Sequence, residues 1–184
     1  VSADHPITVH AVSGYSGGGR QMIENCELGN ADPYWIYGLT LAHKHVPEMH
    51  YYTGLSYPPI FVPSVGKYRQ GMLVQVPLHL RSMARPATGQ TIHDLLYARY
   101  EGQQYIRVMP FGEPVAMLSP EALNGTNLLE LFVFENSTAG QLLLVARLDN
   151  LGKGASGACV QNMELMLNLE SALTNSAFVD SAAG

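Results

Sequence analysis

Apolar and polar residues alternate along several short segments of this chain, which is typical of strands that bury one face. Residues 7–12 (ITVHAV) show this alternation. Three further apolar runs of strand length are residues 34–42, 71–80 and 104–111. Pro77 lies within the run 71–80, and because proline has no N–H to donate, this strand is expected at a sheet edge. The Pro-broken segment 57–63 is expected to be irregular.

The strongest pairing signal is two long apolar runs, residues 128–136 and 141–150, joined by the residues STAG. Two β-rich runs with a short link that contains glycine predict a β-hairpin. Residues 112–127, before the hairpin, are expected to form a loop. The chain has no internal repeat and no long polar linker, so we expect one α+β domain with a substantial antiparallel or mixed sheet.

Helical spacing and capping residues predict helices between these strands. A short helix is expected at residues 21–26. Another is expected around Pro47, which a helix tolerates only in its first turn. Thr91 is expected to cap a third helix over residues 92–102. The apolar face of this third helix is formed by Ile92, Leu95 and Leu96.

Residues 154–169 form the last expected helix. Its apolar face is formed by Ala155, Cys159, Met163, Met166 and Leu167. Cys159 is therefore expected to be a small buried hydrophobe. The tail 171–184 is small and polar, and it is expected to fray.

Charged residues make up only 14% of the 184 residues, and the formal net charge is −5. An ordinary soluble domain has about 25% charged residues, so this chain is expected either to leave much uncharged surface in water or to cover it with a partner. The mild acidity argues against nucleic-acid binding. No apolar run reaches membrane-spanning length, and the first residues show no signal-peptide pattern. The two cysteines cannot form a disulfide framework and fit a reducing compartment.

Two histidines two residues apart, His43 and His45, stand beside Lys44 and Glu48 in the run HKHVPE. On an extended chain both histidines point the same way, so with Glu48 they could hold a metal, in an approximation of the cupin metal motif. The spacings are one residue short, and no second histidine motif follows. Alternatively, one histidine is a general base and Lys44 attracts an anionic substrate. The third interpretation is that His45 and His50 are ordinary polar surface residues and that His43 is a hydrogen-bonded core residue.

A serine- and glycine-rich run, SGYSGGGR at residues 13–20, follows the first strand. Glycines let backbone N–H groups converge on an anion, and the serine hydroxyls and Arg20 add donors. A flexible turn or a linker is the alternative. A linker seldom lies between a strand and the helix that follows it, which weakens that version.

Residues 152–157 (GKGASG) match the pattern G-x-G-x-x-G of dinucleotide-binding folds. That fold needs a second parallel strand with an acidic residue about 20 positions further on, and the remaining residues offer no such strand. We therefore reject a dinucleotide site here and expect the glycines to allow close helix packing. The helix start with Lys153 could still attract a phosphate. Neither Cys26 nor Cys159 resembles an activated nucleophile.

Three stretches together resemble one family: SGYSGGGR at 13–20, AHKHVPEM at 42–49 and LDNLGKGASGACVQNMELM at 148–166. In this order they resemble the C-terminal half of N-acetyl-gamma-glutamyl-phosphate reductase. The segment FVPSVGKYRQGMLVQVPL at 61–78 looks like the second, shorter type of that enzyme. The resemblance runs from about residue 6 to residue 169.

The resemblance implies an NADP-dependent step of arginine biosynthesis. In that step a cysteine attacks N-acetyl-glutamyl 5-phosphate, phosphate leaves, and hydride reduces the thioester to N-acetyl-glutamate 5-semialdehyde. The implied roles are acid–base catalysis by His43 with Tyr37, substrate binding by Ser13, Ser16, Arg20 and Lys44, and cofactor binding by Gly14, Gly17, Lys153, Gly154, Gln161 and Asn162. Whether His43 or His45 is the acid–base group, and whether Arg20 or Lys44 holds the phosphate, is left open.

The family's nucleophile motif, of the N-P-G-C-Y or G-C-Y-A-T type, does not occur in this chain, nor does its nucleotide-binding G-x-x-G loop. Residues 1–184 are therefore expected to be the C-terminal substrate and dimerisation domain alone, inactive without the nucleotide-binding domain. The implied fold is a mixed, largely antiparallel sheet with helices on one face, as in glyceraldehyde-3-phosphate-dehydrogenase-like enzymes.

The resemblance implies two partners: the nucleotide-binding domain of the same enzyme and a second subunit, which forms a homo-oligomer through the sheet. No nucleic acid, membrane or metal is expected, and the expected location is the cytoplasm. Two alternatives remain. One is a cupin-like metal-binding enzyme that uses His43, His45 and Glu48. The other is a non-catalytic scaffold or binding domain.

Overall fold

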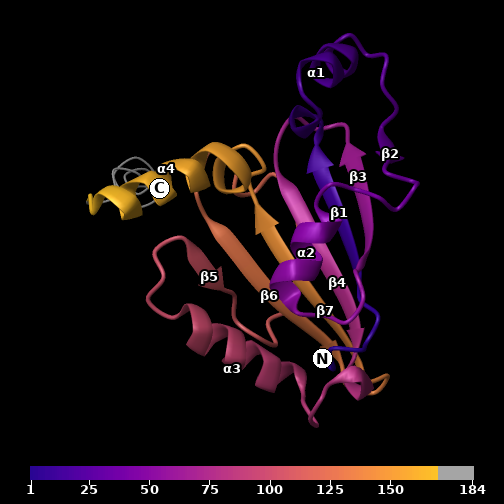
Figure 1. Cartoon of the computed structure of the whole chain (residues 1–184), viewed down its shortest axis with the longest axis vertical. Coiled ribbons are helices and arrows are strands. Elements are labelled where there is room, and N and C mark those ends of the chain that lie inside the picture. Colours follow the sequence, from indigo (N-terminus) through magenta and orange to yellow (C-terminus); the bar gives the residue numbers. More distant parts are fainter. Residues whose placement is uncertain (170–184) are drawn as a thin grey trace.

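The computed structural model describes residues 1–169, so the prediction for the tail lies outside the described residues. A mixed seven-stranded sheet forms its centre, with the strand order β2-β3-β1-β4-β7-β6-β5 (Figure 1). The strands are β1 (Thr8–Gly14), β2 (Tyr34–Ile36), β3 (Ile60–Gly66), β4 (Met72–His79), β5 (Ile106–Val108), β6 (Leu129–Asn136) and β7 (Gln141–Leu148). The α-helices are α1 (Arg20–Glu27), α2 (Val46–Thr53), α3 (Gly89–Tyr100) and α4 (Gly157–Leu167).

Four of the six strand pairs are antiparallel, and only β1–β3 and β5–β6 run parallel. The predicted hairpin is confirmed, because β6 and β7 pair in register from Leu129↔Leu148 to Asn136↔Gln141. Strand β1 is parallel to β3, and β4 is antiparallel to both β1 and β7. Strands β1, β3 and β7 therefore run in the same direction and have their C-terminal ends on the same side of the sheet. Loops that follow these three strands are therefore neighbours in space.

Helices α2 and α3 cover the same face of the sheet. Val46 and Met49 of α2 pack against a cluster around Val9, Ala11 and Phe61. Ile92 and Leu96 of α3 pack against a cluster of Leu78, Val133 and Leu142. Register places both clusters on one side, because Ala11 pairs with Val74 and residues of β4 that are an even number apart share a face. The predicted one-sided helix arrangement is confirmed.

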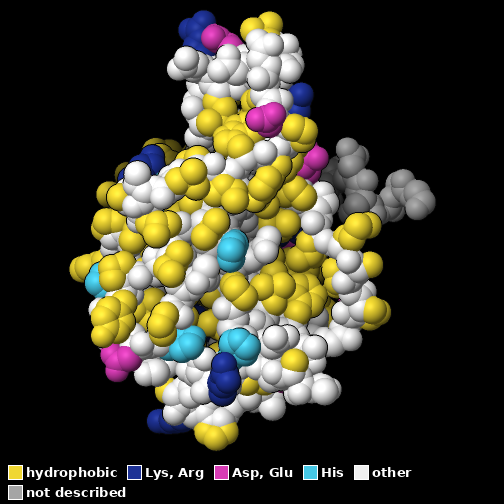
Figure 2. All heavy atoms as spheres, turned by 90° about the vertical axis from the view of Figure 1, so that its right-hand side faces the viewer, with side chains coloured by type: hydrophobic (Ala, Val, Ile, Leu, Met, Phe, Trp, Pro, Cys, Tyr) yellow, Lys and Arg dark blue, Asp and Glu magenta, His cyan; other side chains and the backbone are white. Residues whose placement is uncertain are grey.

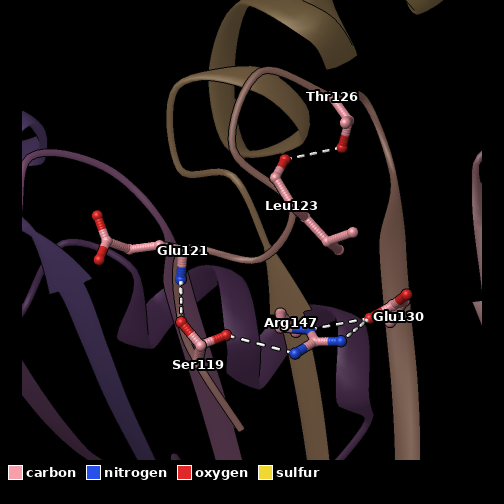
Figure 3. A network of polar contacts seen from close by, with 6 residues as sticks. All are labelled: Ser119, Glu121, Leu123, Thr126, Glu130 and Arg147. Atoms are coloured by element: carbon pink, nitrogen blue, oxygen red, sulfur yellow. Dashed lines mark hydrogen bonds and ion pairs between the residues drawn. The ribbon is translucent and has the colours of Figure 1, made fainter. Parts of the chain in front are cut away.

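Part of the opposite face of the sheet is covered by the loop between β5 and β6 rather than by helices. Leu118 and Met109 pack there against Leu73, Phe132 and Val145. Figure 3 shows how Arg147 of β7 ties this loop down. Its guanidinium pairs with Glu130 of β6 and donates to the Ser119 carbonyl.

Two expectations about proline were wrong. Segment 57–63 is not irregular throughout, because β3 begins at Ile60 and includes Pro63. Although Pro63 has no N–H to donate, its carbonyl accepts a hydrogen bond from the Tyr37 N–H. Strand β4 is not at an edge either. The β1–β4 ladder ends at Gln75, so Pro77 pairs with β7 alone although β4 lies inside the sheet.

Two other expected strands are shorter than predicted. Of residues 34–42, only Tyr34–Ile36 form a strand, because Gly38 and Leu41 take positive φ angles of 65° and 59° and turn the chain. Of residues 104–111, only Ile106–Val108 pair with β6.

Two helix predictions also need correction. The cap of α3 is Thr88, whose side chain accepts from the Thr91 N–H, and Leu95 is 63% exposed. The expected apolar face of α4 is not buried, since Met163, Met166 and Leu167 are exposed. Cys159 is exposed as well, contrary to prediction. In Figure 1 α4 extends away from the sheet, so nothing in the described chain covers this face.

The expectation that glycines 152–157 allow close packing is confirmed. Residues Gly152–Ser156 form a π-helical turn, η3, before α4. A Cβ on Gly152 would lie 2.2 Å from the Thr126 carbonyl oxygen, and one on Gly157 would lie 2.3 Å from Asn127 Oδ1. A Cβ on Gly154 would lie 3.3 Å from its nearest neighbours, the Asp149 carbonyl oxygen and Leu148 Cδ1.

Gly152→Ala is therefore expected to lower the free energy of unfolding by about 1–3 kcal/mol, since the backbone carbonyl must move. Gly154→Ala is the matched control in the same turn and is expected to cost clearly less. Urea denaturation followed by circular dichroism measures both. Equal stability of the two variants would show that the close approach is not needed.

Candidate functional site

A pocket of about 610 Å³ lies where β1, β3 and β7 end. We call it the strand-end pocket. Three segments far apart in the sequence build it: the loop after β1, the segment between β2 and α2, and the start of η3 after β7. The predicted site residues that line it are Ser13, Gly14, Ser16, Gly17, Tyr37, His43, Lys44 and Gly154. The structure thus brings both sequence motifs together at one place, at the C-terminal ends of parallel strands.

His43 lies among aromatic rings, with its ring centroid 5.0 Å from that of Phe61 and 5.7 Å from that of Tyr37. The His45 backbone N–H donates to His43 Nδ1 at 3.2 Å. In a neutral ring with this contact, the hydrogen is on Nε2. Burial lowers the pKa of His43 below its ordinary value, and electrostatic interactions with His45 and Lys44 lower it further. His43 is therefore a neutral imidazole at pH 7.

Tyr37 reaches the same pocket from the end of the short strand β2. Gly38 next to it has a positive φ of 65°, and a Cβ there would lie 3.7 Å from His43 Cδ2. Burial raises the pKa of Tyr37 above its ordinary value, so its hydroxyl stays protonated. Tyr37 can therefore donate a hydrogen bond into the pocket.

The loop after β1 packs on the turn between β3 and β4. The N–H groups of Tyr15 and Ser16 donate to the carbonyls of Tyr68 and Arg69. A Cβ on Gly14 would lie 2.5 Å from the Arg69 carbonyl oxygen, so glycine is required here by packing. Ser13 at the end of β1 and Ser16 in the loop line the pocket, and the Ser13 hydroxyl donates to the Gly14 carbonyl at 3.2 Å.

The structure does not bring four of the predicted residues into the pocket. Arg20 is 92% exposed at the start of α1 and pairs with Glu24. Lys153 Nζ donates to Gln161 Oε1 at 2.7 Å and lies 5.6 Å from the ring centroid of Tyr105. Burial lowers the pKa of Lys153 below its ordinary value. Asn162, the fourth, is exposed on α4.

Sequence reasoning missed Asp149 and Asn150, which follow β7. Asp149 is 1% exposed and accepts three hydrogen bonds, from Gln70 Nε2, the Gly125 N–H and the Leu151 N–H. It therefore joins three segments beneath the strand-end pocket. One signal in the sequence could have found Asp149: it is an acidic residue directly after a long apolar strand. A carboxylate buried at such a position needs several hydrogen-bond donors, which predicts that neighbouring segments converge on it.

The metal alternative finds no support in the geometry. Within residues 1–169, no group of three or more His, Cys, Asp or Glu is arranged to hold a metal ion. The sheet is also open, with β2 and β5 as its two edges, rather than a cupin barrel. In the same part of the chain, no helix is long and apolar enough to cross a membrane.

The mixed sheet with helices on one face and a pocket at the strand ends is a domain of the α+β class, as the sequence predicts. Residues 1–150 match the family described as the semialdehyde dehydrogenase dimerisation domain. The chain belongs to this family.

Curated relatives confirm the resemblance to N-acetyl-gamma-glutamyl-phosphate reductases. The chain is 48% identical over 177 residues to "N-acetyl-gamma-glutamyl-phosphate reductase 2" of Nostoc sp. (strain PCC 7120), covering 89% of this chain and 55% of the relative. It is 49% identical over 175 residues to the reductase of Burkholderia ambifaria, covering 92% and 56%. It thus spans about half the length of the curated relatives it matches.

Solved structures with this fold include two aspartate semialdehyde dehydrogenases. The enzyme II of Vibrio cholerae aligns with a TM-score of 0.60 and 17% identity, covering 89% of this chain and 55% of that one. The probable enzyme of Pseudomonas aeruginosa aligns with a TM-score of 0.62 and 17% identity, covering 88% and 55%. At such low identity these likenesses concern the fold alone.

Proposed function

We propose that this chain is the substrate-binding and dimerisation part of an NADP-dependent reductase of arginine biosynthesis. The reductase converts N-acetyl-glutamyl 5-phosphate to N-acetyl-glutamate 5-semialdehyde. One observation carries the proposal: the serine–glycine and histidine motifs converge on one pocket at the strand ends, in a chain that is 48% identical over 177 residues to a reductase. The names of those relatives supply the substrate.

The pocket suits an anionic acyl phosphate. Lys44 adds a positive charge at its wall, and the Ser16 hydroxyl is a neutral donor, whereas the Ser13 hydroxyl donates to the Gly14 carbonyl at 3.2 Å. In the proposed reaction a thiolate attacks the acyl carbon, phosphate leaves, and reduction of the thioester releases the aldehyde and the thiol. Neither cysteine of this chain lines the pocket, since Cys26 is buried on α1 and Cys159 is exposed on α4. The nucleophile is therefore assigned to the preceding domain.

His43 is the proposed acid–base group. In the tautomer described above, Nε2–H donates to the acyl oxygen as negative charge develops there. Taking the thiol proton at Nε2 requires the other tautomer, for which the 3.2 Å contact from the His45 N–H is given up. Tyr37 lines the same pocket, and its hydroxyl is the proposed second donor to this oxygen.

The residues proposed for NADP fit the cofactor only in part. Gly17 and Gly154 line the pocket, and a group bound there could lie against their backbones. Lys153 and Gln161 bind each other outside the pocket, and Gly14 has a packing role. NADPH, when bound, supplies hydride. We assign most of its contacts to the nucleotide-binding domain and derive no step from these five residues.

We also propose that a second copy of the chain covers the sheet face opposite α2 and α3. That face holds a hollow of about 660 Å³, lined in part by Pro77, Phe134 and Leu143. Beside it Met117 is 88% exposed. Figure 2 shows one side of the molecule, with hydrophobic side chains across its hollowed middle and few charges there. The low charge of the sequence is consistent with such an interface. The proposed location of the enzyme is the cytoplasm.

Light scattering tests this interface. The chain, of 20.0 kDa, is expected to form a dimer or a larger assembly. Met117→Asp is expected to shift it toward the monomer because a buried charge is costly at an interface. Leu95→Asp, at an exposed position on the helix side, is the control and should leave the assembly unchanged. A monomer at high concentration would contradict the proposal.

A reductase assay tests the function. We expect NADPH oxidation with N-acetyl-glutamyl 5-phosphate when the chain is joined to an upstream nucleotide-binding domain of the same protein. We expect none from the 184 residues alone, because no cysteine reaches the pocket. Turnover by the chain alone would overturn the assignment of the nucleophile. No turnover by the joined protein would overturn the proposed function.

A further inference from the structure

Asn150 lies at the wall of the strand-end pocket and joins two of its loops. Its Oδ1 accepts from the Gly71 N–H at 2.7 Å, and its Nδ2 donates to Ser16 Oγ at 3.0 Å. The Gly71 N–H can only donate, so the amide oxygen must face Gly71 and the amide nitrogen must face Ser16. The geometry therefore fixes the direction of the second bond.

This direction has a consequence for Ser16. One lone pair of its hydroxyl is occupied by Asn150, and no residue in the described chain accepts the hydroxyl hydrogen. Ser16 is 9% exposed and lines the strand-end pocket. Its hydrogen is thus available to a group inside the pocket, and a hydroxyl that already accepts one bond is a better donor.

Asn150 itself is held from below. The neighbouring Asp149 is bound by Gln70, Gly125 and the Leu151 N–H, which fixes the backbone on both sides of Asn150. The amide therefore has one well-defined position.

We propose that Asn150 is a positioning residue, which keeps the Ser16 hydroxyl as a donor to an anionic oxygen of the substrate. This inference rests on the proposed function, because the anion is supplied by the acyl phosphate substrate. That substrate carries a phosphate and a carboxylate, and either can accept the bond. The chemistry is the same for both: an anionic oxygen accepts from a neutral hydroxyl.

The test uses Asn150→Asp in the joined reductase. Aspartate keeps an acceptor for the Gly71 N–H but cannot donate, so Ser16 must donate to it and turns its hydrogen away from the pocket. We expect KM for the acyl phosphate to rise about tenfold or more, the size of one hydrogen bond to a charged group. Ser16→Ala is expected to raise it by a similar factor.

The double variant separates positioning from charge. In the Ser16→Ala background, Asn150→Asp can act only through its added charge, so its effect on KM is expected to be clearly smaller than in the unmodified enzyme. The same fold-change in both backgrounds would overturn the proposal. A purely structural role for Asn150 would lower the melting temperature without this coupling.

The reverse reaction identifies the anionic group. If Ser16 binds the phosphate, KM for inorganic phosphate rises in Ser16→Ala and KM for the semialdehyde does not, and the converse holds for the carboxylate. No change in either KM would overturn the proposal. If Asn150→Asp fails to fold, Ser16→Thr takes its place in the test. Because threonine keeps the hydroxyl, KM for the acyl phosphate must stay near that of the unmodified enzyme in Ser16→Thr while it rises in Ser16→Ala. An unmodified enzyme that does not reduce the acyl phosphate would refute the proposed function instead.

Discussion

Replacing His43 with glutamine in the joined reductase is expected to lower kcat by about 10²–10⁴-fold, the usual contribution of a positioned acid–base group. Glutamine fills similar space but cannot exchange a proton at neutral pH. The position among Phe61 and Tyr37, at ring-centroid distances of 5.0 and 5.7 Å, should still be occupied. Steady-state rates of NADPH oxidation measure the loss.

His45→Gln is the matched control for this prediction. The bond from residue 45 to His43 Nδ1 comes from the backbone N–H, so it survives the substitution. We expect only a small loss of kcat. A large loss in His45→Gln with an unchanged rate in His43→Gln would move the acid–base role to His45.

The pH profile gives an independent reading of His43. Its pKa is lowered from 6.5 by burial and then by the charges of His45 and Lys44, and the neutral ring is the active form. Activity is thus present above this pKa and is lost as the pH falls through it, so the acid limb of kcat/KM lies below pH 6.5. Lys44→Met removes one of these charges and should move the limb to higher pH. A limb that stays in place would show that Lys44 does not act on His43.

Asp149→Asn is expected to lower the free energy of unfolding by about 2–5 kcal/mol. Asp149 Oδ2 accepts from Gln70 Nε2 at 2.9 Å and from the Gly125 N–H at 2.8 Å, while Oδ1 accepts from the Leu151 N–H at 2.9 Å. Either orientation of an asparagine amide turns its NH₂ group toward at least one buried donor. Urea denaturation followed by circular dichroism measures the change.

The control is Asp32→Asn, an exposed aspartate in the loop before β2. It removes the same charge and is expected to change the free energy of unfolding by no more than about 0.5 kcal/mol. If both variants lose equal stability, net charge rather than the buried hydrogen bonds would be responsible. If neither loses stability, Asp149 does not hold the three segments together.

Local signals in the sequence were enough for elements whose partners are near in the chain. The β6–β7 hairpin needed only two apolar runs and a short turn, and α2 needed only Pro47 in its first turn. Elements that depend on distant partners were misjudged. Strand β3 is stabilised by pairing with β1 and β2 despite Pro63, and β4 lies inside the sheet although Pro77 favours an edge.

The candidate site divides in the same way. The serine–glycine loop and the His43 segment were identified by residue type, because glycine loops and histidine have distinctive chemistry at short range. Arg20 and Lys153 were chosen for their charge, but local partners hold them elsewhere: Glu24 pairs with Arg20, and Gln161 accepts from Lys153. Asn150 carried no signal of its own, since its role depends on Gly71 and Ser16 lying beside it.

By itself, the sequence determined the α+β class, the hairpin and the two motifs, since each depends on the order of residues within a short segment. It also determined the low charge that predicts covered surfaces. Only the tertiary structure decided that β1, β3 and β7 run in the same direction and end on the same side of the sheet. This arrangement brings His43 and Ser16 into one pocket and buries Asp149 beneath them. The physical reason is that strand order and register are set by hydrogen bonds and packing between residues far apart in the chain.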